Sequence, residues 1–215
     1  MRSADVAVID YGVGNLRSVR AAFEHCGAQV QVTSAPEVIL RAARVVLPGV
    51  GAFANGMSEL RRRGLDEVAR EVALRGVPLL GICLGMQMLL SVSEEFGLTK
   101  GLDLIRGRVV AMNTTDCDGH PLKIPHVGWN GLLPAVGRDG WRGSLLEDIR
   151  TGEAVYFLHS FTAQPEDPRH RIADCQYGGR AIPAVVACDN VSGCQFHPEK
   201  SGNVGLRVLR RFLTS

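Results

Sequence analysis

Short apolar runs alternate with amphipathic stretches through the first half of the sequence. A strand buried on both faces is a continuous apolar run, whereas a helix packed on a sheet carries apolar residues every three or four positions. This pattern predicts strands over residues 6–10, 29–32, 45–47 and 78–82. It predicts helices over residues 16–26, 53–74 (with a break near Gly64) and 84–95. Such alternation predicts a parallel sheet with helices on both faces.

The second half of the sequence has a different pattern. Short strand-like runs follow one another with turn residues between them and few helices. The predicted strands cover residues 108–111, 154–158, 171–177, 184–187 and 193–196, and a closing helix covers 206–213. We therefore expect an α/β fold in which mixed or antiparallel strands extend a parallel core. The length of 215 residues is within the usual size of one domain, so a single domain over residues 1–215 is expected.

Composition narrows the function classes. Apolar residues make up 46% of the chain, enough for a sizeable core, and the net charge is only +2. No strong electrostatic attraction to nucleic acid or to an anionic membrane follows from that charge. No apolar stretch approaches the roughly 20 residues of a membrane span, and residues 1–5 lead into a run too short for a signal peptide. We expect a cytoplasmic protein.

Six cysteines are spread along the chain, and none forms a CxxC pair or has a nearby His at zinc-binding spacing. They are expected to remain thiols in a reducing compartment, without a metal site or another cofactor. Most are expected to be small buried apolar residues. Cys83 differs from the others in its local sequence.

Cys83 lies in a Gly-x-Cys-x-Gly turn between a predicted buried strand and a predicted helix. This is a nucleophile elbow with Cys in place of Ser. Gly81 and Gly85 relieve crowding at the sharp turn. The start of a helix favours thiolate over thiol, and the N–H of Leu84 is placed to donate to an oxyanion. The alternative is an inert cysteine at a strand–helix junction.

An activated cysteine needs a base, and the base needs a group that fixes its ring. His197 follows an apolar strand and precedes Pro198. Glu199 is two residues further on, so its carboxylate can turn back towards the imidazole in an extended chain. The sequence therefore predicts a Cys-His-Glu triad.

Residues 81–87 and 196–199 resemble the nucleophile and base motifs of the class I, triad-type glutamine amidotransferases. Residues 10–16, 47–53 and 125–130 resemble, more narrowly, the glutaminase subunits of imidazole glycerol phosphate synthases. The likeness extends over nearly the whole chain. It implies a flavodoxin-like fold with a central, mostly parallel sheet, and hydrolysis of L-glutamine to L-glutamate and ammonia. It also implies a heterodimer with a (β/α)8-barrel cyclase, which receives the ammonia through a channel and makes imidazole glycerol phosphate and AICAR in histidine biosynthesis.

The resemblance also implies residue roles. Cys83 is expected to be the nucleophile, His197 the base and acid, and Glu199 the orienting carboxylate. The residues expected to bind the substrate or line the oxyanion hole are Gly49, Val50, Gly51, Leu84, Gln87, Ser160 and Phe161. The peptide at Val50 is expected to flip, which would couple activity to the partner. The residues expected at or near the cyclase interface are Asn15, Trp129 and Lys200.

Some positions depart from the family pattern. Phe161 stands where Tyr is more usual, and segments 114–123 and 134–142 are longer than in a minimal member. These longer segments resemble members that serve surface-sugar biosynthesis. A second hypothesis is therefore the same glutaminase chemistry feeding a synthase that aminates a nucleotide sugar. A third, of another class, is a catalytically silent regulatory subunit.

Overall fold

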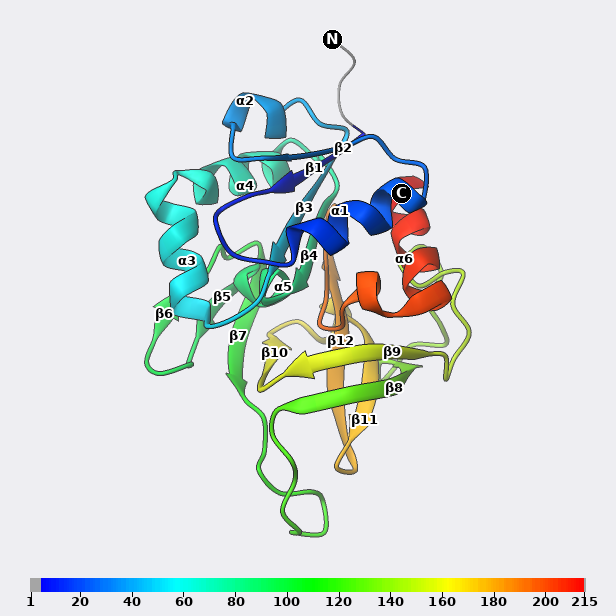
Figure 1. Ribbon diagram of the computed structural model, residues 1–215. Helices are drawn as coiled ribbons and strands as arrows, with labels where there is room; N and C mark the ends of the chain where they lie inside the picture. The colour runs from blue at the N-terminus through cyan, green and yellow to red at the C-terminus, as the bar shows by residue number, and fades with distance from the viewer. Residues whose placement is uncertain (1–4, 215) are drawn as a thin grey trace.

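A nine-stranded sheet forms the centre of the computed structural model, which describes residues 5–214 (Figure 1). Its neighbouring strands follow the order β2-β1-β3-β4-β13-β12-β11-β8-β9. The first five of these strands pair in parallel, and the remaining pairs are antiparallel. The strands are β1 (Val6–Ile9), β2 (Val30–Thr33), β3 (Arg44–Gly49), β4 (Leu79–Cys83), β8 (His126–Pro134), β9 (Ala154–His159), β11 (Arg171–Tyr177), β12 (Arg180–Cys188) and β13 (Val191–Cys194). The expected parallel core with antiparallel additions is confirmed.

Helices cover both faces of the parallel part of the sheet. Val6 and Val8 of β1 pack in the same core as α1 (Leu16–His25) and α6 (Gly202–Thr214). Ala7 and Ile9 face the other core, with α2 (Pro36–Ile39), α3 (Phe53–Arg62) and α4 (Leu65–Leu74). Strands with a core on each side need apolar residues at every position, which explains their continuous apolar runs.

The predicted helix over residues 84–95 is wrong after its first turns. Helix α5 (Leu84–Met88) ends early, and β5 (Leu90–Ser93) begins two residues later. β5 belongs to a second, four-stranded sheet of order β10-β7-β5-β6, with β6 (Thr99–Lys100), β7 (Ile105–Ala111) and β10 (Phe161–Pro165). Leu89 and Leu90 are fully buried where the observed strand begins, so pairing with β7 satisfies the burial that the helical periodicity also predicted.

Other element boundaries also differ from the prediction. β8 and β10 were not predicted as strands, β12 is longer than expected, and α6 begins at Gly202 instead of residue 206. The break near Gly64 is confirmed: this residue has a left-handed φ of 67° and separates α3 from α4. Short 3-10 turns are η1 (Pro168–His170) and η2 (Pro198–Lys200).

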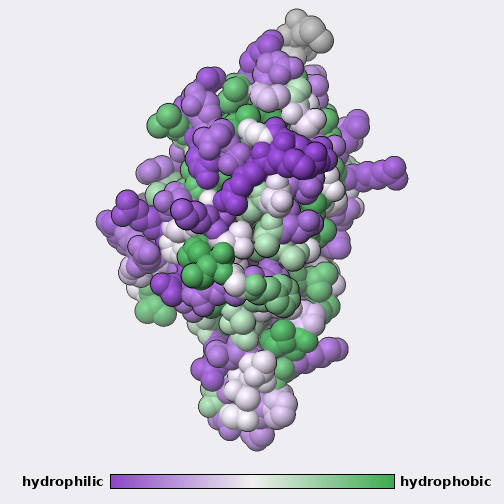
Figure 2. All heavy atoms as spheres, turned by 90° about the vertical axis from the view of Figure 1, so that its left-hand side faces the viewer, coloured by the Kyte–Doolittle hydropathy of each residue, from purple (hydrophilic) through white to green (hydrophobic). Residues whose placement is uncertain are grey.

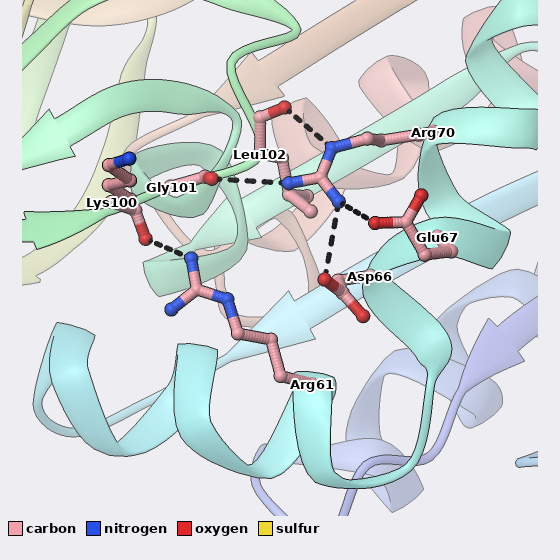
Figure 3. Close-up of polar contacts among 7 residues, drawn as sticks. All are labelled: Arg61, Asp66, Glu67, Arg70, Lys100, Gly101 and Leu102. Carbon is pink, nitrogen blue, oxygen red and sulfur yellow. Dashed lines mark hydrogen bonds and ion pairs between the residues drawn. The ribbon is translucent and has the colours of Figure 1, made fainter.

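Two arginines tie α3 and α4 to the β5–β6 hairpin and the residues just after it (Figure 3). Arg61 donates to the carbonyl oxygen of Lys100 at 2.6 Å, and Arg70 donates to that of Leu102 at 3.2 Å. Asp66 holds the Arg70 guanidinium from the same helix. These contacts fix the base of a hairpin that extends towards the carboxyl ends of β3 and β4. Over this part of the molecule the outer face is mainly hydrophilic, with small separate apolar areas (Figure 2).

All six cysteines are free thiols. Among residues 5–214, no helix is long and apolar enough to cross a membrane. Residues 1–4, at which no signal peptide is expected, lie outside the described residues.

Candidate active site

Cys83 is the last residue of β4, and the parallel register places it beside Gly49 at the end of β3. Its backbone has φ 54° and ψ −109°, a conformation that costs a non-glycine residue about 1–3 kcal/mol. The following turn packs directly on β3: a Cβ added at Gly85 would lie 1.8 Å from the carbonyl oxygen of Leu47. The glycine of the elbow is therefore required by close backbone packing, as the sequence predicts.

The Cys83 side chain is only 6% exposed and has two polar contacts. Sγ lies 3.7 Å from the carbonyl oxygen of Leu158 and 3.7 Å from Nε2 of Gln195. Cys83 directly precedes α5, as expected, but that helix has only five residues. A short helix aligns few peptide dipoles, so side chains near the sulfur carry more of its electrostatic environment than the sequence suggested.

His197 and Glu199 follow β13 and form a buried pair. Nδ1 of His197 lies 2.9 Å from Oε1 of Glu199, and the two side chains are 2% and 1% exposed. Burial alone would lower the pKa of His197. The nearby Cys83 sulfur and the hydrogen bond to Glu199, together with the charges of both groups, outweigh burial and raise that pKa from 6.5 to about 9. Nε2 has no hydrogen-bond partner within residues 5–214, and the ring lines a cleft beside Cys83.

This cleft has a volume of about 440 Å³. Eight residues predicted from the sequence line it: Val50, Gly51, Cys83, Leu84, Gln87, Ser160, Phe161 and His197. Gly49 is buried behind its wall, and Glu199 lies behind His197. The sequence prediction missed five further lining residues: Glu95, Phe96, Pro125, Leu158 and His159.

Glu95 is the one carboxylate among the cleft-lining residues that the structure describes. It is 9% exposed, and its Oε2 accepts a hydrogen bond from the backbone N–H of Phe53 at 2.6 Å. Glu95 is not at a helix end, although the sequence predicts a helix over residues 84–95. The chain leaves the helix at Met88, so Glu95 lies on the hairpin and turns inward, while Glu94 stays exposed beside Arg108.

Tyr11 is a further residue that the sequence prediction missed. It is fully buried after β1, and its hydroxyl donates to the carbonyl oxygen of Pro48 at 2.8 Å. Burial raises its pKa, so the phenol is neutral. A Cβ at Gly49 would lie 2.6 Å from that hydroxyl oxygen. Tyr11 therefore anchors the start of the loop that includes Val50, and an aromatic residue two positions after β1 was the available signal.

His159 is a packed, hydrogen-bonded core histidine. Its Nδ1 lies 2.8 Å from the carbonyl oxygen of Phe161, and its Nε2 lies 3.0 Å from Nδ1 of His126. Burial, foremost, lowers the pKa of His159 to about 4. His126 is also buried, with Nε2 2.8 Å from Oδ1 of Asn130, and these contacts indicate a structural role. The pair supports the backbone that forms one wall of the cleft.

An exposed apolar surface on β8 and β9 adjoins the cleft at Leu158. Trp129 is 57% exposed and packs edge-on against Tyr156 at 6.0 Å between ring centroids. Nζ of Lys200 lies 6.0 Å from the centre of the same Tyr156 ring, so the structure brings two predicted interface residues together. Exposed Val127 pairs with exposed Leu158 on the neighbouring strand. Asn15 lies on another element, directly before α1.

Asp116, Asp118 and His120 form a group whose ligand atoms lie within 4.8 Å of one another. They belong to the loop between β7 and β8, which extends from the body of the molecule (Figure 1). Oδ1 of Asp116 already accepts from the backbone N–H groups of Asp118 and His120. These contacts account for the cluster as a turn of the loop, and none of the three residues lines the cleft.

Comparisons with known proteins agree with the geometry of the site. Residues 7–215 match the family model described as glutamine amidotransferase class-I. The chain is 50% identical to the imidazole glycerol phosphate synthase subunit HisH 1 of Legionella pneumophila (strain Paris), over 98% of this chain and 99% of that protein. It is 49% identical to the HisH subunit of Halobacterium salinarum, over 99% of this chain and 94% of that protein.

Solved structures support the fold. A crystal structure of a glutamine amidotransferase has a TM-score of 0.72 at 17% identity, covering 98% of this chain and 97% of its own. The glutaminase domain of the Trypanosoma brucei CTPS, with bound acivicin, has a TM-score of 0.67 at 18% identity, covering 97% and 92%. At these identities the likeness shows that the arrangement of strands and helices is shared.

Proposed function

We propose that this chain, which belongs to the glutamine amidotransferase class I family, is the glutaminase subunit of an imidazole glycerol phosphate synthase in histidine biosynthesis. The observation that carries the chemistry is the strained Cys83 turn, which opens into a cleft beside the buried His197–Glu199 pair. The near full-length likeness to HisH subunits supports the pathway. Segments 114–123 and 134–142, on which the nucleotide-sugar alternative is based, do not line the cleft.

In the proposed mechanism, the Cys83 thiolate attacks the side-chain amide carbon of glutamine. The new C–S bond converts the amide carbonyl to an oxyanion, which the N–H of Leu84 and the loop at Val50 are placed to receive. His197 gives its proton to the nitrogen, and the C–N bond breaks to release ammonia and leave a thioester. Water, deprotonated by His197, hydrolyses the thioester to glutamate and restores the thiolate. Glu199 keeps the imidazole oriented and stabilises its protonated form.

The cleft also fits the amino-acid end of glutamine. Glu95 places a buried carboxylate in the wall of the cleft that Cys83 also lines, and a carboxylate in a cleft favours a cationic group. We assign it to the substrate's α-ammonium group. Gln87 and the backbone of Ser160 and Phe161 form the adjoining wall. Because the Phe161 contact is through the backbone, the missing tyrosine hydroxyl should have little effect.

The apolar surface on β8 and β9 fits a partner that receives the ammonia. Leu158 belongs to both the surface and the cleft lining, so a protein that covers Val127 and Trp129 also closes the cleft. Closing the cleft keeps ammonia from escaping into water. We propose that the covering partner is the (β/α)8-barrel cyclase, and that Lys200 and Asn15 contribute to the same heterodimer interface.

The test measures glutamate release from glutamine by this chain in complex with its cyclase, together with imidazole glycerol phosphate formation. Cys83→Ala is expected to abolish both activities, and retained turnover would exclude the triad assignment. Glu95→Gln is expected to raise KM for glutamine at least about tenfold, because an ionic hydrogen bond is lost. Glu94→Gln, at the exposed neighbouring position, is the matched control and should leave both KM and kcat for glutamine unchanged. Glutamate release without imidazole glycerol phosphate formation would retain the glutaminase and exclude the histidine pathway.

A further inference from the structure

Gln195 lies level with the catalytic cysteine because of strand register. β13 pairs with β4 in parallel, with Gly193 opposite Gly81 and Cys194 opposite Ile82. The next residue along β13's direction is therefore brought beside Cys83. Gln195 is fully buried and does not line the cleft, so it approaches the sulfur from behind, on the protein side.

Both amide ends of Gln195 have partners. Nε2 lies 3.7 Å from Sγ of Cys83, and Oε1 lies 3.0 Å from Nε2 of Gln87. Nε2 of Gln87 also lies 3.2 Å from the carbonyl oxygen of Phe161. A continuous chain of contacts thus runs from the backbone of the cleft wall to the reacting sulfur.

The contact to Phe161 fixes the donor and acceptor of each of these hydrogen bonds. A backbone carbonyl can only accept hydrogen bonds, so the Gln87 group facing Phe161 is the NH₂. The same NH₂ faces Gln195, which must present its oxygen to accept. The amide of Gln195 then has only its NH₂ left to face the sulfur. Turning either amide over would bring two acceptors or two donors together.

We propose that Gln195 is a catalytic residue whose amide N–H donates a hydrogen bond to the Cys83 sulfur and stabilises the thiolate that attacks the substrate. The carbonyl oxygen of Leu158, on another side of the sulfur, acts in the opposite direction. A carbonyl oxygen accepts only from the protonated thiol, whereas an N–H donor favours the thiolate. The role in glutamine hydrolysis rests on the proposed function, but the effect on the sulfur can be measured without glutamine.

Other groups close to the sulfur act in known directions. The His197 imidazolium favours the thiolate, and its raised pKa reflects that contact and Glu199. Tyr11 and Cys194 interact electrostatically with Cys83, and burial raises the pKa of each, so both stay neutral. Gln195 is therefore the uncharged donor that the described residues place at the sulfur alongside the charged His197.

The experiment compares the alkylation of Cys83 by iodoacetamide in the full chain and in two Gln195 variants. Gln195→Met removes both amide contacts at similar volume. Gln195→Glu keeps an acceptor for Gln87 but replaces the donor at the sulfur with an acceptor. Gln164→Met, at an exposed position on β10, is the matched control. Peptide mass spectrometry follows Cys83, and the exposed Cys117 serves as an internal reference for reagent and pH.

Losing a hydrogen bond to a charged group is expected to slow alkylation of Cys83 at neutral pH roughly tenfold in Gln195→Met, and further in Gln195→Glu. The pH midpoint of alkylation should move higher in both variants, while Cys117 and the Gln164→Met protein stay unchanged. Circular dichroism establishes that each variant is folded.

An unchanged rate and midpoint in a folded Gln195→Met or Gln195→Glu protein would overturn the proposal. A lower kcat for glutamine with unchanged alkylation would also overturn it, because Gln195 would then act only through Gln87. Failure of the proposed function gives a different result. In that case the wild-type complex releases no glutamate, while the alkylation of Cys83 still depends on Gln195.

Discussion

Replacing Glu199 by Gln tests how the buried pair supports catalysis. The substitution keeps the shape of the side chain and an oxygen that can accept from Nδ1 of His197, which lies 2.9 Å from Oε1 in the native protein. It removes the negative charge. Glu199 is 1% exposed, so no nearby bulk water screens the loss.

The expected magnitude follows from the pKa of His197, which is raised from 6.5 to about 9. A tenfold change in an acid dissociation constant corresponds to about 1.4 kcal/mol, so the net stabilisation of the imidazolium is about 3 kcal/mol. Cys83 and Glu199 share it. Removing the Glu199 charge should therefore cost about 1.5 kcal/mol and lower kcat about tenfold.

The assay is glutamate release by the complex with the cyclase, measured as kcat/KM against pH. The alkaline limb of the native profile should fall near pH 9, where His197 loses its proton. In Glu199→Gln the limb should move to lower pH by about one unit, because the imidazolium is less stabilised. A kcat within twofold of native, with an unmoved alkaline limb, would refute the electrostatic role of Glu199.

Three further predictions concern packing, acid stability and the oxyanion loop. Gly85→Ala should lower the free energy of unfolding in urea by about 3 kcal/mol, because its Cβ would overlap the Leu47 carbonyl, whereas Gly140→Ala, in open space, should change it by less than about 0.5 kcal/mol. Burial lowers the pKa of His159 from 6.5 to about 4, so between these pH values the unfolded chain binds a proton that the folded chain excludes. The free energy of unfolding should therefore fall by up to about 3 kcal/mol as the pH drops from 6.5 to 4, and His159→Gln should make this fall smaller. Tyr11→Phe should cost about 1 kcal/mol of stability and lower kcat several-fold by releasing the loop, and an unchanged kcat would show that the hydroxyl does not position it.

Local sequence was sufficient to predict the catalytic residues that lie at or just beyond strand ends. Cys83 ends a buried apolar strand and His197 follows one, and parallel strands bring their carboxyl ends to one edge of the sheet. Glu199 is two residues from His197, so its distance to the imidazole is set by a short turn. These positions depend little on the rest of the fold.

The missed residues depend on contacts between distant segments. Gln195 and Cys83 are 112 residues apart, and only the register of β13 against β4 brings them together. Glu95 enters the cleft because β5 pairs with β7, a pairing that the helical periodicity of residues 84–95 concealed. Tyr11 looks like an ordinary core aromatic until Pro48 is placed beside it. Periodicity predicts which side chains are buried but not which partner each one meets.

The strained backbone of Cys83 lowers the stability of the fold at the position where the nucleophile is needed. Glycine adopts a positive φ such as the 54° at this position without the cost of a side chain. A change to Gly would therefore relieve about 1–3 kcal/mol of strain while removing the nucleophile. In a lineage released from the need for ammonia transfer, selection for a better-folded protein would favour losing this residue early. A cysteine at a position that favours glycine is therefore expected only where its thiol is needed.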